Sequence, residues 1–292
     1  MGRTTFATIP TGSSDSHESR KALTWSIIFL AEGLLAIFLN MLTLVAFAVN
    51  TNLRKRSLYL LINLSFADML VGVGTIGISV TMLTTREMYY FEHPNDVFKP
   101  AEMTDMAATA ASMLGLALMS LERMYAALAP FKHRVLPVRV YIIGIVLPWF
   151  GSVSALVLYT ASRLYFIYVT LVAVIADLSL VCVCYTVTII SVKRSAHSVA
   201  PHGPQQREHE LIKTALLVTS LSVISWIPSI IWQVHEGKVD NNWDAYALFG
   251  RYVNSFVNPV VYILRMKDFR RAIAKCGRRH HRLVVPKGTC NR

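Results

Sequence analysis

Asn258-Pro259-Val260-Val261-Tyr262 closes the last strongly apolar segment of the chain, and a basic amphipathic stretch, residues 265–276, follows it at once. A proline near the end of a bilayer-length helix removes a backbone hydrogen bond and permits a kink. Asn and Tyr side chains are polar groups that hydrocarbon penalises unless they have partners. The stretch therefore predicts a hinge in a helix that packs inside a membrane bundle.

The rest of the chain has the composition of a polytopic membrane protein. Of its 292 residues, 54% are hydrophobic and 16% are charged, and the mean hydropathy is +0.45. The apolar residues fall in long runs rather than spreading evenly. Windows of about 20 residues place spans at 24–50, 58–84, 101–122, 138–160, 164–192, 211–235 and 243–264. The predicted fold is an all-α membrane protein, a seven-transmembrane helix bundle.

Lysine and arginine set the predicted orientation. With the N-terminus outside, the inner segments carry far more of these residues than the outer loops, which hold Arg86, Lys99, Arg163 and Lys238. The asymmetry accounts for most of the net charge of +12. Anionic lipid of the inner leaflet or an acidic protein surface is a sufficient partner for this charge, so we expect no nucleic-acid binding.

Ionisable side chains within the predicted spans are few, and polar groups of other spans can meet one of them. Asp68 lies midway along the second span, Ser112 lies in the third, and Asn254 and Asn258 lie one turn apart on the seventh. Lipid penalises such groups, so we expect them to face the bundle interior. They offer only oxygen ligands, which suit Na⁺ and not zinc. Two interpretations stay open: a Na⁺ site with Asp68 and Ser112 as metal ligands, and a water-filled polar network without an ion.

The predicted inner face carries a second polar group. The third span ends in Glu122-Arg123, and the sixth begins near Glu208 on the same side of the membrane. An acid beside an arginine at a helix end is commonly a solvated pair. The alternative is a switch in which Arg123 bridges to Glu208 in one state and releases it in another. Tyr185 and Tyr262 then receive the arginine when the bridge opens.

Taken together, these features resemble the rhodopsin-like (class A) G-protein-coupled receptors over residues 33–276. The resemblance is carried by markers in the family's order and spacing: Asn40, Asn63 to Asp68, Glu122-Arg123-Met124, Trp149, Tyr185, Ser225-Trp226-Ile227-Pro228, Asn258 to Tyr262 and Phe269. It implies a ligand-operated receptor, not an enzyme, without catalytic residues and without a cofactor other than Na⁺ as an allosteric ion. The partners it implies are an extracellular small molecule or peptide, a heterotrimeric G protein, membrane lipids, an arrestin and a receptor kinase.

The resemblance also implies a multi-pass plasma-membrane protein with an extracellular N-terminus. It divides the chain into an N-terminal tail (1–22), a seven-transmembrane receptor domain (23–264), a short amphipathic membrane-surface eighth helix (265–277) and a cytoplasmic tail (278–292). Cys276 lies in the surface helix. Palmitoylation there would anchor the segment, and a free thiol is the alternative.

Roles for individual residues follow from the same resemblance. The sodium-binding network matches Asp68, Ser112, Trp226, Asn254 and Asn258. The switch and the G-protein contacts match Glu122, Arg123, Pro130, Phe131, Tyr185, Glu208, Pro259 and Tyr262.

The ligand end is harder to interpret. Asp105 lies 18 residues before Arg123 in the same span, which is about 27 Å along a helix. In amine receptors of this family the matching aspartate binds the ligand's ammonium, and Tyr252 matches the tyrosine that steadies it. Arg251 is adjacent to Tyr252 and offers a nearby carboxylate a competing partner. The other expected ligand contacts are Glu102, Thr109, Trp226 and Gln233.

Three departures from the family pattern point to another branch. Phe98 stands where a cysteine is expected, the loop at Ser162 is only a few residues long, and Asp177 takes the place of the usual proline. Together these features resemble the melanocortin, cannabinoid and adenosine receptors, and this is our main expectation for the ligand type. A biogenic-amine receptor using Asp105 is the alternative. A polytopic transporter or channel is a remote one, because inverted repeats and rings of pore charges are not visible. Asp177 either lines the cavity or faces a neighbouring side chain.

Overall fold

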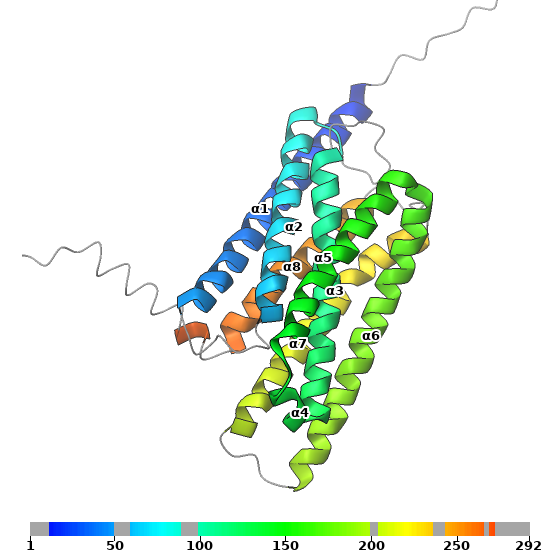
Figure 1. Cartoon of the computed structure of the whole chain (residues 1–292). Coiled ribbons are helices and arrows are strands. Elements are labelled where there is room, and N and C mark those ends of the chain that lie inside the picture. Colours follow the sequence, from blue (N-terminus) through cyan, green and yellow to red (C-terminus); the bar gives the residue numbers. More distant parts are fainter. Residues whose placement is uncertain are drawn as a thin grey trace, which may run out of the picture.

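A computed structural model describes residues 12–49, 59–88, 99–198, 204–235, 243–265 and 269–271. Long helices and one short helix make up nearly all of these segments, which contain no strand (Figure 1). In chain order they are α1 (Gly12–Val49), α2 (Tyr59–Thr85), α3 (Lys99–Leu128), α4 (Pro130–Arg134), α5 (Val138–Ala161), α6 (Arg163–Ser198), α7 (Pro204–Val234) and α8 (Trp243–Arg265). The predicted all-α bundle is confirmed.

Several helices run further than the apolar spans that predicted them. α1 begins at Gly12, so residues 12–22, which we expected to be part of a tail, are helical. No proline or glycine interrupts the chain between Gly12 and Gly33, so polar residues continue the helix beyond the apolar run. α7 begins at Pro204, before the predicted start at 211, because proline is well tolerated in the first turn of a helix.

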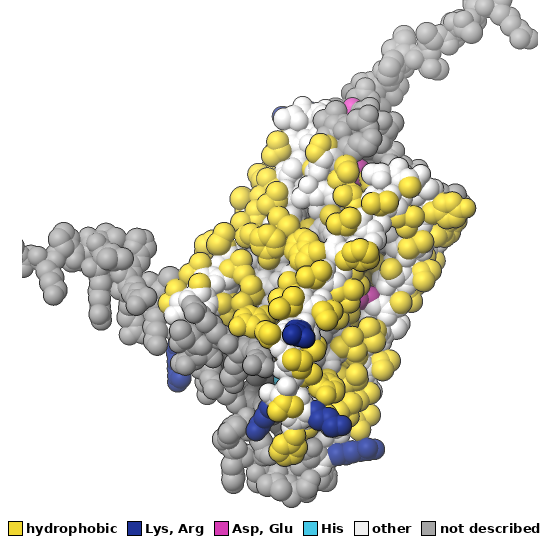
Figure 2. Space-filling model, in the orientation of Figure 1, with side chains coloured by type: hydrophobic (Ala, Val, Ile, Leu, Met, Phe, Trp, Pro, Cys, Tyr) yellow, Lys and Arg dark blue, Asp and Glu magenta, His cyan; other side chains and the backbone are white. Residues whose placement is uncertain are grey.

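Five helices in the described part of the chain, α1, α2, α3, α5 and α6, are long and apolar enough to cross a bilayer. α7 contributes a shorter apolar stretch, Ser220–Val234. α8 has 23 residues, enough to span the hydrocarbon core, but its inner side is rich in buried polar groups. Figure 2 shows hydrophobic side chains over much of the visible face and most of the visible Lys and Arg at one end.

α3 lies at the centre of the bundle, where it contacts α2, α5, α6 and α7. α1 packs along α2 and α8, and α7 packs along α8. We call the end where α3, α6 and α8 begin the cavity end. The opposite end, where α3 passes into the short helix α4, is the Arg123 end, which is lower in Figure 1.

Buried polar side chains tie neighbouring helices together. Asn40 Nδ2 on α1 donates a 2.8 Å hydrogen bond to the Ser255 carbonyl of α8. Trp149 Nε1 on α5 donates to Asn63 Oδ1 on α2 over the same distance. Within lipid such groups require partners, so each bond also fixes which face of its helix turns inward.

Gly74 allows α2 and α3 to approach closely near the cavity end. A Cβ atom at this position would lie 2.8 Å from the Cα of Asp105, which is closer than real side chains permit. The glycine therefore holds the Asp105 turn of α3 against α2. This contact decides which way Asp105 faces.

The segment after α8 is described only at residues 269–271, which are helical. Phe269 is fully buried and packs edge-on against Phe47 and Tyr262. The rest of the predicted surface helix after Arg265, with Cys276, lies outside the described residues, and so do the tail from 278 onward and residues 1–11.

Candidate functional site

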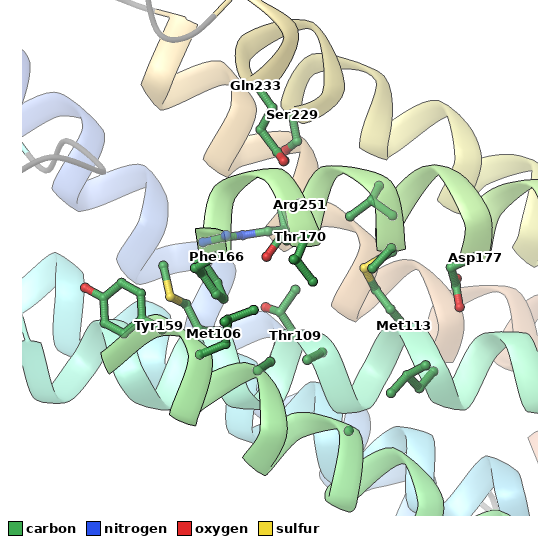
Figure 3. Close-up of a pocket in the computed structure, with 18 of the residues that line it drawn as sticks. Met106, Thr109, Met113, Tyr159, Phe166, Thr170, Asp177, Ser229, Gln233 and Arg251 are labelled. Atoms are coloured by element: carbon green, nitrogen blue, oxygen red, sulfur yellow. The ribbon is translucent and has the colours of Figure 1, made fainter. Parts of the chain in front are cut away.

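A cavity of about 330 Å³ lies between α3, α5, α6, α7 and α8 (Figure 3). This volume falls in the range of small-molecule sites in proteins, roughly 300–1,000 Å³. Its walls are mainly apolar. Thr109, Trp226 and Gln233, which the sequence predicts as ligand contacts, all line it.

Each of these three residues carries a buried polar atom that lacks a hydrogen-bond partner among the described residues. The atoms are Thr109 Oγ1, Trp226 Nε1 and Gln233 Oε1. A buried donor or acceptor without a partner is costly, and in native proteins water or a ligand usually satisfies it. These atoms are themselves buried, so they lie beside the cavity and behind its mainly apolar surface.

Asp105 has a different environment from the one expected of a ligand contact. It is 1% exposed and accepts a hydrogen bond from Arg251 Nη2 in a buried ion pair. Arg251 lines the cavity, whereas Asp105 does not. Of the two possibilities open from the sequence, pairing with Arg251 is therefore the one observed.

Glu102 and Tyr252 also lie away from the cavity wall, although we expected both to contact a ligand. Tyr252 is buried with its ring edge-on to Phe29 of α1, 5.4 Å away. Consecutive helical residues point about 100° apart, so Tyr252 faces α1 while Arg251 faces the cavity. Glu102 is buried one turn before Asp105.

Asp177 of α6 lies on the cavity wall, which the sequence left undecided. Figure 3 places it and Arg251 toward opposite ends of the cavity, with Thr109 and Met113 between them. No hydrogen bond or ion pair joins Asp177 to another described residue. The signal for this site was already in the sequence, where a carboxylate occupies a bilayer-depth position usually held by proline.

Asp68 forms the polar centre that the sequence predicts. Its carboxylate is fully buried and accepts hydrogen bonds from Ser112 Oγ (2.6 Å) and Asn258 Nδ2 (3.0 Å). The amide oxygens of Asn254 and Asn258 are buried without a partner among the described residues. A carboxylate, a hydroxyl and unpaired amide oxygens fit the oxygen ligands that Na⁺ prefers. Trp226 lies apart from these bonds and packs with Met113 and Val174.

At the Arg123 end, Glu122 contacts two basic side chains. Arg123 Nε lies 3.2 Å from Glu122 Oε2, and His133 Nε2 on α4 lies 2.7 Å from Glu122 Oε1. Tyr141 OH is 3.3 Å from the same histidine nitrogen. The sequence reasoning missed His133, because the path of the chain through α4 brings it back to Glu122.

The remaining switch residues are divided between buried and exposed positions. Tyr262 is buried, its hydroxyl lacks a partner among the described residues, and its electrostatic neighbours include Tyr185 and Arg123. Pro259 is buried within α8. Pro130 begins α4, and Phe131 after it is 81% exposed. Glu208 lies in α7, but its side chain is outside the described part of the chain, so the predicted bridge from Arg123 stays a prediction.

Comparison with known proteins defines the class to which this bundle belongs. Residues 39–161 and 155–262 match the seven-transmembrane receptors of the rhodopsin family. The match covers well over half of the chain, so the chain belongs to this family of G-protein-coupled receptors, which are receptors rather than enzymes.

The individual relatives have low sequence identity to this chain, but the matches cover most of its length. The histamine H2 receptor of Homo sapiens is 24% identical over 282 residues, which cover 85% of this chain and 77% of the relative. The 5-hydroxytryptamine receptor 4 of Homo sapiens is 24% identical over 297 residues, covering 82% and 75%. The histamine H2 receptor of Canis lupus familiaris is also 24% identical, covering 90% and 82%. These relatives favour the amine alternative over the melanocortin, cannabinoid and adenosine types.

Proposed function

We propose that this chain is a plasma-membrane receptor that binds a small cationic amine at the cavity end and activates a heterotrimeric G protein at the Arg123 end. The observation that carries the proposal is the cavity itself. It combines mainly apolar walls with one carboxylate, Asp177, among the described residues that line it. An aromatic amine needs such a combination, because its ring seeks apolar contact and its ammonium seeks an acid.

The relatives add support for an amine, since they are named for histamine and 5-hydroxytryptamine. A basic peptide would instead need accessible acids. Glu102 and Asp105, the acids we considered for such a ligand, are 7% and 1% exposed. A peptide ligand of the melanocortin type is therefore the weaker candidate.

Charge supports an orientation with the Arg123 end in the cytoplasm. Basic side chains cluster there, among them Lys132, Arg134, Arg139, Lys193 and Arg194. Cytoplasmic segments of membrane proteins are enriched in Lys and Arg. The same charge suits contact with anionic lipid headgroups.

Signalling follows from a difference in ligand affinity between two states of the bundle. An agonist shifts the equilibrium only if it binds the active state better than the inactive one. We infer that the active state frees Arg123 from Glu122 and offers Arg123, Pro130 and the exposed Phe131 to the G protein. Na⁺ held by Asp68 and Ser112 would stabilise the inactive state.

The test is a second-messenger screen of cells that express the full chain. The compounds are histamine, 5-hydroxytryptamine, tryptamine and 2-phenylethylamine, each with an analogue in which a hydroxyl replaces the amine. Nucleosides, neutral lipids and short basic peptides complete the panel. We expect responses to amines and little or none to the matched alcohols. A nucleoside, lipid or peptide as the best agonist would contradict the amine assignment.

The control variant is Arg123→Ala, with its amount at the cell surface measured separately. It removes the arginine proposed to contact the G protein, so it should abolish the response while the receptor still reaches the surface. Normal signalling by this variant would overturn the proposed coupling mechanism.

A further inference from the structure

Among the acidic side chains of the described helices, four are candidates to hold the ammonium of an amine ligand: Glu32, Glu102, Asp105 and Asp177. The first three are buried away from the cavity lining. Asp177 is the one that lies on the wall. Position alone therefore separates it from the others.

Of the four acids, Asp105 also has the negative charge that is least available to a ligand. Arg251 already neutralises it, and Arg251 itself stands between Asp105 and the cavity. An ammonium that entered from the cavity would meet the guanidinium first and would be repelled by it. Displacing Arg251 would leave a buried positive charge without compensation, which is strongly unfavourable.

Asp177 has the opposite character. Its carboxylate has no hydrogen bond or ion pair with another described residue. An ionisable group at bilayer depth is expensive to keep without a partner, so a partner supplied from outside is the simplest reason for it. A second cavity of about 10 Å³ lies beside it, between Ser222 and Trp226, with room for about one water.

We propose that Asp177 is the residue that binds the ammonium of the ligand, and that Asp105 serves as the fixed partner of Arg251. This inference rests on the proposed amine-receptor function. It also sets the orientation of the ligand. The cation lies at the Asp177 end of the cavity, and the apolar ring extends past Met113 and Thr109 toward Gln233 (Figure 3).

The depth of Asp177 distinguishes this arrangement from an anchor at Asp105. Asp177 lies 14 residues into α6, which begins at Arg163, whereas Asp105 lies 6 residues into α3, which begins at Lys99. These separations correspond to about 21 Å and about 9 Å of helix. The ligand therefore enters the cavity with its ammonium group leading, and the ammonium lies at the depth of Trp226. Trp226 lines both cavities.

The experiment measures binding directly, as the thermal stabilisation of the purified full-length receptor by the four amines and their matched alcohols. Asp177→Asn keeps the size of the side chain and removes its charge. We expect it to weaken the apparent affinity for the amines by at least about 30-fold. Asp177→Glu keeps the charge and should retain binding. The weak effect of the alcohols should be the same in wild type and in Asp177→Asn.

The comparison variant carries Asp105→Asn together with Arg251→Gln, which removes both members of the ion pair. We expect it to bind the amines at least as tightly as wild type, because it also removes the guanidinium that repels an ammonium at the cavity wall. If this variant loses amine binding to the same extent as Asp177→Asn, or if Asp177→Asn binds normally, the assignment of Asp177 is overturned while the amine receptor stands. If no amine stabilises the wild type, or if alcohols do so equally well, the proposed function fails and the assignment fails with it.

Discussion

Asp105 and Asp177 are two aspartates in neighbouring transmembrane helices, and their surroundings differ sharply. Asp105 is buried against Arg251, whereas Asp177 lies on a cavity wall without a partner among the described residues. A carboxylate paired with a buried cation belongs to the fold, because removing either charge strands the other. A carboxylate without a partner adds little to the folded state and is free to serve a ligand. The partner of an acid, rather than its depth, thus separates the two roles.

Asp68 is an intermediate case. Neutral donors, Ser112 and Asn258, satisfy its carboxylate without cancelling its charge. The site can therefore accept a small cation without breaking an ion pair. Three aspartates of the same bundle thus have three kinds of environment: a fixed charge pair, an open cavity wall and a hydrogen-bonded network.

The largest expected effect separates the paired acid from the open one. Arg251→Met leaves Asp105 as a buried charge without its arginine, so we expect the free energy of unfolding to fall by about 3–5 kcal/mol. Asp177→Leu breaks no hydrogen bond or ion pair with another described residue and should change the same quantity by less than about 1 kcal/mol. Thermal unfolding of both purified variants, without ligand, gives the comparison.

A double variant controls for the loss of arginine packing. Arg251→Met combined with Asp105→Leu removes both charges and should recover most of the lost stability, because the Asp105 carboxylate is no longer buried without its arginine. A loss in Asp177→Leu as large as that in Arg251→Met would show that Asp177 has a structural partner, and the distinction between the two aspartates would collapse.

A smaller effect is expected at Gly74, which positions Asp105. Gly74→Ala introduces a Cβ 2.8 Å from the Asp105 Cα, so α3 must move away from α2. We expect a loss of about 1–3 kcal/mol in stability, typical of overpacking. Gly115→Ala is the matched control, because its Cβ meets Leu64 Cδ1 at an ordinary 3.5 Å. Equal stabilities of the two variants in thermal unfolding would argue against a close-packed Gly74.

The hydrogen-bonded network around Asp68 should make the affinity for agonist depend on the sodium in the buffer. If Na⁺ binds there in the inactive state, replacing sodium by N-methylglucamine at equal ionic strength should raise agonist affinity by about 5- to 10-fold. Asp68→Asn keeps the shape of the side chain but removes the ion's charged ligand, so this dependence should disappear. Competition binding in the two salts measures it. A salt response in Asp68→Asn equal to that of wild type would favour a water-filled network.

Features set by helix periodicity and depth could be predicted from the sequence. The apolar spans and the ordered markers predicted the bundle, and the depths of Asp68, Ser112 and Asn258 predicted that they would meet. The rotation of α3 could not be predicted, because the contact at Gly74 decides whether Asp105 faces the cavity or Arg251. The role of Asp177 stayed open for the same reason: only the assembled helices show which side chains have partners.

At the Arg123 end, the contact between Glu122 and His133 likewise could not be predicted from the sequence. The prediction that rests on this contact has the smallest expected effect. Here the acid is shared, with Arg123 on one carboxylate oxygen and His133 on the other. His133→Phe removes one of the bonds that hold Glu122 in place. A net hydrogen bond is worth about 1 kcal/mol, so we expect the ion pair between Glu122 and Arg123 to open more often and basal signalling to rise about two- to fivefold.

Tyr141→Phe is the control for this change. It removes the tyrosine hydroxyl that lies 3.3 Å from His133 Nε2, and it leaves the bond from His133 to Glu122 intact. Basal second-messenger levels at equal surface expression should therefore match wild type in Tyr141→Phe and exceed it in His133→Phe. If both variants signal at the wild-type level, Arg123 alone holds Glu122 in place. Glu122 and Arg123 would then be a simple charge pair, as Asp105 and Arg251 are.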